Sequence, residues 1–161
     1  MTKQATGRVE PTGGGRDLIL ERYFDADVED VWASITEPGR TARWFGAWTG
    51  EPGAGSVVQV TMGFEDGAPV MPMTITVCEP PRRLRVHAKD EYGEWDLEAL
   101  VERDGGRTRL TFVHHLDDAA NAAEVGPGWE YYLDALVAVE SGDPAPDFDD
   151  YYPAMAVHYG G

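Results

Sequence analysis

The feature that most constrains the fold of this chain is a succession of short stretches in which apolar and polar residues alternate. These stretches are residues 58–64, 71–77, 84–88, 95–101 and 110–116. Alternation with a period of two predicts β-strands that have one apolar and one polar face. Because short turns connect the stretches, neighbouring strands must run antiparallel. The sequence therefore predicts an antiparallel meander whose apolar face has to be covered by another element.

Helical periodicity is found on the N-terminal side of this meander. Residues 18–24 form an apolar run that predicts a first strand. Asp27 suits an N-cap, and apolar residues follow it at positions 28, 31, 32 and 35, which predicts an amphipathic helix. Pro38 should end this helix, and the residues from 36 or 37 to 45 are expected to form a second short helix.

A longer helical pattern follows the meander. Gly126-Pro127-Gly128 is expected to break a short helical segment at residues 118–124 and to start a new helix. Its apolar stripe comprises Trp129, Tyr132, Leu133, Leu136 and Val137. Because the helices lie outside the run of strands, the order predicts an α+β fold in which the sheet packs on this last helix.

The chain is expected to have three segments. Residues 1–16 are glycine-rich and almost without apolar side chains, which predicts a flexible leader. Residues 17–142 form the domain. Residues 143–161 form an acidic and aromatic tail, for which three alternatives stay open: packing on the domain, docking on another chain, or disorder.

Charge and composition restrict the partners. The chain has 29 acidic and 13 basic residues, a net charge of −16, which repels nucleic acid and anionic membranes. The N-terminal residues lack the apolar core of a secretory signal, and no apolar run is long enough to span a membrane, so a cytoplasmic location is expected. The single cysteine, Cys78, lies in a strand pattern, where an inert buried thiol is the usual case.

Five short motifs in order resemble a known family. They are the pattern apolar-x-Ala-x-x-x-x-Val-Trp at residues 24–32, Trp44-Phe45, the turn Glu79-Pro80-Pro81-Arg82-Arg83-Leu84, the strand at residues 108–112, and Gly128-Trp129. Together they resemble the activator of Hsp90 ATPase homologue-like branch of the START-like (SRPBCC, helix-grip) superfamily, over residues 18–141.

The resemblance implies a fold more than an activity. It implies a helix-grip domain, in which an antiparallel sheet of about seven strands wraps around a long C-terminal helix and two short helices follow the first strand. It also implies a cavity between the sheet and the C-terminal helix. Functions in the superfamily range from lipid carriage to aromatic polyketide cyclisation and chaperone stimulation, and the branch offers no catalytic motif to carry over.

The most enzyme-like cluster is His114-His115 with Asp117 and Asp118. Neighbouring residues of a strand point to opposite faces, so the two imidazoles should diverge, and we expect no metal site. His114 shares a face with the apolar residues of its strand, which makes it the one candidate for proton transfer. Ser34, Ser56 and Ser141 lie in no nucleophile motif, so we expect no catalytic set and no cofactor.

A set of large apolar and aromatic residues is expected to face the gap between the sheet and the last helix. It consists of Trp44, Phe45, Met73, Trp95, Leu97, Phe112, His114, Trp129, Tyr132, Leu133 and Leu136. Such a set predicts either a filled core or a site for an apolar ligand. Three hypotheses follow: non-catalytic binding of a hydrophobic or aromatic small molecule, association with an Hsp90-type chaperone, or a cyclase- or aromatase-like enzyme that uses His114 with Tyr132 or Asp117. Exposed sheet edges and the tail also allow a homodimer.

Overall fold

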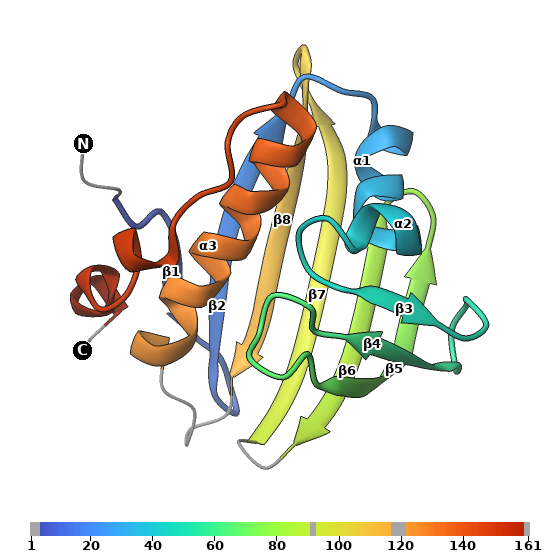
Figure 1. The fold of residues 1–161 in the computed structure, drawn as a ribbon, viewed down its shortest axis with the longest axis horizontal. Helices are drawn as coiled ribbons and strands as arrows, with labels where there is room; N and C mark the ends of the chain where they lie inside the picture. Colours follow the sequence, from blue (N-terminus) through green and yellow to red (C-terminus); the bar gives the residue numbers. More distant parts are fainter. Residues whose placement is uncertain (1–3, 91–92, 117–121, 160–161) are drawn as a thin grey trace.

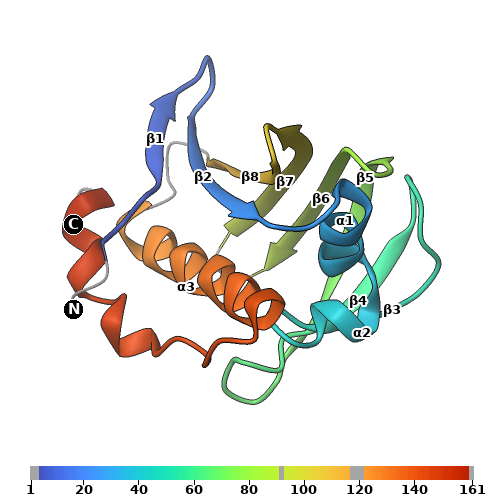
Figure 2. The same ribbon diagram turned by 90° about the horizontal axis from the view of Figure 1, so that it is seen from above.

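A computed structural model describes residues 4–90, 93–116 and 122–159. Eight antiparallel strands form one sheet in the order β1-β2-β8-β7-β6-β5-β4-β3, and the helices cover one of its faces (Figures 1 and 2). The strands are β1 (Arg8–Pro11), β2 (Arg16–Phe24), β3 (Ala47–Thr49), β4 (Val57–Thr61), β5 (Val70–Glu79), β6 (Arg83–Asp90), β7 (Gly93–Asp104) and β8 (Arg107–Leu116). The helices are α1 (Val28–Thr36), α2 (Pro38–Thr41), α3 (Ala122–Ser141) and the short 3-10 segments η1 (Phe148–Asp150) and η2 (Ala154–Tyr159).

The predicted α+β arrangement is confirmed, although the sheet has eight strands rather than about seven. The chain crosses from β2 through α1 and α2 to β3 at the far edge and then returns strand by strand to β8. Figure 2 shows α3 along the part of the sheet near β2 and β8, while α1 and α2 lie on the same face toward β3; α1 also contacts β7 and β8, and α2 contacts β3. The helical cover is therefore divided between one long helix and one pair of short helices. Among the described residues, no helix has both the length and the apolar character needed to cross a bilayer.

The N-terminal segment differs from the expected flexible leader. Residues 8–11 pair with β2, so that Arg8 lies opposite Ile19 and Pro11 opposite Arg16. The glycines expected to make the leader flexible lie in the turn of this hairpin, where the N–H of Thr12 donates to the carbonyl of Gly15 at 2.9 Å. Glycine adopts tight turns without steric cost, so the same residues that indicate flexibility also suit a hairpin turn.

The helix α3 also differs from expectation, because it runs without a break through Gly126 and Pro127. The segment 143–159 folds back along α3 and buries Tyr151, Met155 and Tyr159. A Cβ atom on Gly126 would lie 2.4 Å from Cδ2 of Tyr159, so glycine is needed here for close packing. Burial under the tail keeps a sequence with poor helix propensity helical, since tertiary packing can override propensity. Of the expected segment at residues 118–124, residues 118–121 lie outside the described residues.

The two glycines that flank Pro127 provide a matched test of this packing. Gly126→Ala is expected to lower the free energy of unfolding by about 1–3 kcal/mol, since the methyl group must displace the ring of Tyr159. A Cβ atom on Gly128 would meet no atom within 4 Å beyond its own stretch of helix. Gly128→Ala should therefore raise stability by up to about 1 kcal/mol through helix propensity alone. Equal effects of the two substitutions in urea denaturation would contradict the proposed close contact.

Candidate ligand-binding cavity

Two adjacent chambers lie on the face of the sheet that the helices cover, the smaller beside α3 and the larger under α1 and α2. The outer chamber has a volume of about 390 Å³ and the inner chamber about 100 Å³. Both are lined by Ile35, Thr41, Phe45, Leu84 and Val86, so the two chambers are neighbours. The outer chamber lies between α1, α2 and β3 on one side and strands β4, β5 and β6 on the other. The inner chamber continues from there toward β7, β8 and α3.

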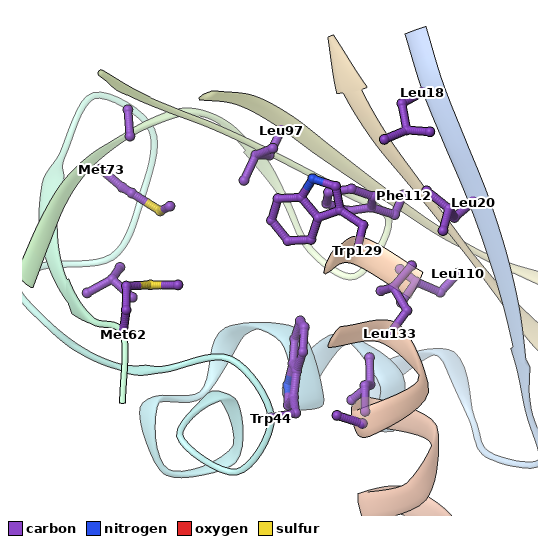
Figure 3. Close-up of a cluster of buried hydrophobic side chains, with 14 of the residues drawn as sticks. Leu18, Leu20, Trp44, Met62, Met73, Leu97, Leu110, Phe112, Trp129 and Leu133 are labelled. Atoms are coloured by element: carbon purple, nitrogen blue, oxygen red, sulfur yellow. The ribbon is translucent and has the colours of Figure 1, made fainter. Parts of the chain in front are cut away.

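The remaining lining residues are mostly apolar. The outer chamber is completed by Trp32, Thr36, Glu37, Pro38, Gly46, Trp48, Pro52, Gly53, Val58, Val60, Met73, Ile75, Cys78 and Pro80. The inner chamber is completed by Trp44, Leu97, Glu98, Ala99, Leu110, Phe112, Trp129 and Leu133. Figure 3 shows Met73 facing Leu97 and Trp129 across a gap, with Trp44 at one side.

Hydrogen bonds fix the helices that cover the outer chamber. The indole N–H of Trp48 donates to the carbonyl of Thr36 at 2.8 Å, and that of Trp44 donates to the carbonyl of Ser34 at 2.9 Å. The hydroxyl of Thr41 donates to the carbonyl of Gly46 at 2.7 Å. These polar groups of the lining residues are therefore bonded within the protein, and the surface that they leave to the cavity is apolar.

A β-bulge in β5 decides which residues face the outer chamber. The pairing with β6 shifts between Ile75, which lies opposite Val86, and Val77, which lies opposite Arg85. The sequence alternation predicts Val77 on the apolar face, but the bulge instead places Cys78 there, opposite Leu84. An extra residue in one strand exchanges the two faces beyond it. Cys78 is consequently a half-buried thiol of the cavity wall rather than a fully buried one.

Trp129 of α3 forms the inner end of the cavity. Its ring lies 4.5 Å from that of Phe112 and 6.2 Å from that of Phe45, measured between centroids. Its indole N–H donates to Nδ1 of His114 at 3.1 Å. Three aromatic side chains from α3, β8 and the segment after α2 thus form one continuous wall, and the hydrogen bond sets the orientation of the indole.

His114 lies behind this wall and lines neither chamber. Its side chain is 2% exposed and stacks on Trp95 at 5.3 Å between centroids. Because an indole N–H can only donate, Nδ1 of His114 is the acceptor in this hydrogen bond. The structure thus places the candidate for proton transfer as a partner of Trp129. Its proposed helper Asp117, like Asp118, lies outside the described residues.

Tyr132, the other proposed helper of His114, also lies outside the chamber linings. Its hydroxyl donates to Oε2 of Glu65 at 2.9 Å, in the loop between β4 and β5. Burial, together with the nearby charge of Glu65, raises the pKa of Tyr132 well above its usual value. Its hydroxyl therefore stays protonated at neutral pH and serves as a hydrogen-bond donor between α3 and this loop.

The outer face of the sheet carries other polar side chains of these strands, and among them Glu98 of β7 also borders the inner chamber. His115 points away from His114, and its ring nitrogens lie 2.8 Å from Oδ1 of Asp17 and 2.9 Å from Oε1 of Glu98. Burial raises the pKa of Glu98, but hydrogen bonds from His115 and Arg83 outweigh it and hold the pKa below its usual value. The predicted divergence of the two histidines is confirmed. Within residues 4–90, 93–116 and 122–159, no cluster of His, Cys, Asp and Glu is arranged to hold a metal ion.

The predicted ligand-contacting residues divide into two groups. Those that line a chamber are Trp44, Phe45, Met73, Leu97, Phe112, Trp129 and Leu133. Those that lie outside both linings are Trp95, His114, Tyr132 and Leu136. Prediction placed the cavity between the sheet and the last helix, whereas most of its volume lies under α1 and α2. The reason is that Trp129 and its aromatic neighbours fill the space beside α3.

Several lining residues were missed by sequence reasoning. Trp32 and Ile35 belong to the predicted apolar stripe of α1, and Leu84 and Val86 belong to a predicted strand face, so their inward orientation could have been used. Trp48 had no such signal, because β3 is only three residues long. Its position depends on the hydrogen bond to Thr36, which the sequence does not indicate.

Comparison with known proteins gives consistent matches. The family model described as activator of Hsp90 ATPase homolog 1-like protein matches residues 25–140. The crystal structure of CalU16 from Micromonospora echinospora is similar over 98% of this chain and 95% of its own, with 30% identity and a TM-score of 0.77. No curated protein matches significantly.

Two further solved structures share the fold at lower identity. DynU16, a protein of the dynemicin biosynthetic locus, is 23% identical, with a TM-score of 0.69, over 86% of this chain and 51% of its own. A protein from Bordetella parapertussis is 20% identical, with a TM-score of 0.74, over 99% of this chain and 93% of its own.

Proposed function

The chain belongs to the activator of Hsp90 ATPase homolog 1-like family, and from that premise we propose that it binds a small hydrophobic or aromatic molecule in its cavity without transforming it. Family membership establishes the fold, while the ligand has to be argued from the site itself. The site in question is the outer chamber, together with the inner chamber beside it.

The observation that carries this proposal is the combination of volume and lining in the outer chamber. Its 390 Å³ lies within the range of about 300–1,000 Å³ that is usual for small-molecule sites. Its interior is formed by buried side chains such as Val58, Val60, Met73 and Ile75. Moving an apolar molecule from water into such a site is favourable by roughly 25 cal/mol per Å² of buried apolar surface. No polar group of the ligand is required for this contribution.

The geometry around His114 supports binding without catalysis. A general base must reach the proton that it removes, directly or through one water molecule. Nδ1 of His114 already accepts a hydrogen bond from Trp129, and Trp129 rather than His114 lines the inner chamber. For Nδ1 of His114 to act on a molecule in the inner chamber, Trp129 would have to move away from it.

Calorimetric titration with naphthylmethanol, a neutral aromatic alcohol, tests the proposal. We expect saturable binding of one molecule per chain with a Kd on the order of 0.1 mM, as a ligand of this size can bind with a few tenths of a kcal/mol per atom. The matched control is benzyl alcohol, which buries less surface and should bind several-fold more weakly. Absence of saturable heat up to the solubility limit would contradict a ligand-binding function.

A further inference from the structure

The place where the outer chamber meets the solvent is marked by its exposed lining residues. These are Glu37, Pro38, Pro52 and Pro80, whereas the residues deeper in the chamber are buried or half-buried. We call these four residues the mouth. Glu37 and Pro38 come from the junction of α1 and α2, Pro52 from the loop after β3, and Pro80 from the turn after β5.

Glu37 is the charged residue of this chamber. Of the described residues that line the outer chamber, it alone carries a formal charge at neutral pH. Its backbone is fixed, because its N–H donates to the carbonyl of Ala33 at 2.9 Å and its carbonyl accepts from the N–H of Thr41 at 2.8 Å. Within the part of the chain that the structure describes, no ion pair or hydrogen bond occupies its carboxylate. Glu37 therefore contributes a negative charge to the lining of the chamber near the mouth.

Two tryptophans belong to the same end of the chamber. Trp32 precedes Glu37 by just over one helical turn on α1, and Trp48 donates its indole N–H to the carbonyl of Thr36, the residue before Glu37. Both side chains line the chamber and are half-buried. The face of an indole ring attracts cations, and tryptophan does so more strongly than the other aromatic residues. A carboxylate together with two indoles is a combination that favours an organic cation.

The charge of the rest of the molecule acts in the same direction. The net charge of −16 gives a field that disfavours an anionic ligand at any opening of the surface. An apolar molecule with a carboxylate, such as a fatty acid, would bring that carboxylate next to Glu37 if its body entered the chamber. An apolar molecule with an ammonium group would instead bring opposite charges together.

We propose that the ligand of this cavity has an apolar, at least partly aromatic body and an amine or quaternary ammonium group, which Glu37 binds at the mouth between Trp32 and Trp48. This inference rests on the proposed function and specifies the class of molecule. The apolar body occupies the chamber below, against Val58, Ile75 and their neighbours. Glu37 thus selects among apolar molecules by charge.

Three probes with the same aromatic ring test the inference: naphthylmethylamine, which is cationic, naphthylmethanol, which is neutral, and naphthoate, which is anionic. In calorimetric titrations of the wild-type chain, the amine is expected to bind about three- to ten-fold more tightly than the alcohol, as a partly exposed ion pair and a cation–π contact together allow. Naphthoate is expected to bind more weakly than the alcohol. The advantage of the amine should decrease as the salt concentration is raised.

Glu37→Gln should remove this advantage and leave the affinity for the alcohol unchanged. The matched control is Glu29→Gln, which changes the net charge by the same amount near the start of α1, the helix that Glu37 follows, at an exposed position that does not line the cavity. The control variant should show the same ratio of Kd values for the alcohol and the amine as the wild-type chain. Equal affinities of amine and alcohol in the wild-type chain, or an amine advantage that survives Glu37→Gln, would overturn the inference while leaving the proposed function in place. Failure of both the amine and the alcohol to bind would overturn both.

Discussion

Replacing Glu130 with alanine is expected to lower the free energy of unfolding by about 3–5 kcal/mol, the usual cost of removing one partner of a buried ion pair. Glu130 lies on α3 and is only 1% exposed. Its carboxylate pairs with Arg22 of β2 at 2.8 Å and accepts hydrogen bonds from the hydroxyl of Tyr159 at 2.6 Å and that of Thr6 at 2.7 Å. One side chain therefore connects the N-terminal segment, the sheet, α3 and the C-terminal segment.

Removal of this carboxylate leaves the other members of the network without their shared acceptor. Arg22 keeps Asp134, whose Oδ1 lies 2.9 Å from Nε, and Asp134 in turn accepts from the hydroxyl of Tyr151 at 2.7 Å. The hydroxyl of Tyr159 loses its acceptor in a buried position, whereas that of Thr6, an exposed residue, can turn to water. An unpaired donor in a buried position costs more than the average hydrogen bond contributes. The segment 143–159 should then detach from α3 at a lower denaturant concentration than the rest of the chain.

The effect of Glu130→Ala should depend on pH. Burial raises the pKa of Glu130, but hydrogen bonds from Tyr159, Thr6 and Arg22 outweigh it and hold the pKa below its usual value. A carboxyl whose pKa is lower in the folded state stabilises the fold above its unfolded pKa of about 4.3, and this contribution is lost as the pH falls through the folded value. The stability difference between wild-type and variant chains should therefore be full at pH 7 and shrink in acid.

Urea denaturation at a series of pH values measures both expectations. The matched control is Glu124→Ala, which removes an exposed carboxylate from the first turn of the same helix and should change stability by less than about 1 kcal/mol. The account of the network would be contradicted if Glu130→Ala changed the free energy of unfolding as little as Glu124→Ala does. It would also be contradicted if the difference in free energy between Glu130→Ala and wild type grew in acid.

Replacing Val58 with tryptophan is expected to abolish detectable binding of the neutral probe naphthylmethanol. Val58 lies on β4, is 5% exposed and lines the outer chamber. The larger indole has space to enter, so it would occupy the volume that the ligand needs. Because the side chain fills a cavity instead of a packed core, the stability of the variant should change by less than the roughly 1–3 kcal/mol that is typical of overpacking.

The neighbouring residue provides the control. Val57 lies on the same strand with its side chain on the opposite face and is 55% exposed. Val57→Trp adds the same atoms outside the cavity and should leave the Kd unchanged. Calorimetric titration of both variants, with circular dichroism to confirm folding, measures the contrast. Unaltered binding in Val58→Trp would show that the ligand does not occupy the outer chamber.

The strands of this fold were predictable because one face of each strand is buried. From β4 to β8, alternation indicates which residues point inward, and Met73, Leu97 and Phe112 all line the cavity. The prediction fails at Val77, where the bulge exchanges the faces. A bulge adds one residue to one strand and leaves no signal in an alternating pattern, because its cause lies in the pairing with β6.

The ends of the chain were harder to predict, because their structure depends on contacts that are distant in sequence. Gly126 indicates a helix break when only its neighbours are considered, yet it is the residue that lets Tyr159 pack against α3. Thr6 and Glu130 are 124 residues apart and form a hydrogen bond. Glu130 itself lies beside the apolar stripe of α3 and would be placed on the solvent side by periodicity alone.

Only part of the candidate site could be predicted from the sequence, because its location also depends on how the elements pack. Sequence pattern indicates which side chains face inward, but it does not indicate whether the space between them is filled. The aromatic residues around Trp129 fill the space between the sheet and α3, and the remaining space lies under the short helices α1 and α2. This location depends on how far α3 extends across the sheet, which is visible in Figure 2 and has no local signal in the sequence.

The position of a bound molecule tests the central claim most directly. Methyl-labelled protein titrated with naphthylmethanol can be followed by nuclear magnetic resonance. If the molecule binds in the outer chamber, saturable shifts should occur at the methyl groups of Val58, Ile75 and Val86, which line it. The exposed methyl groups of Val70 and Val157 should not shift. Shifts confined to those exposed residues, or no saturable shift at the chamber methyl groups, would contradict the proposal that this protein binds a hydrophobic molecule in its cavity.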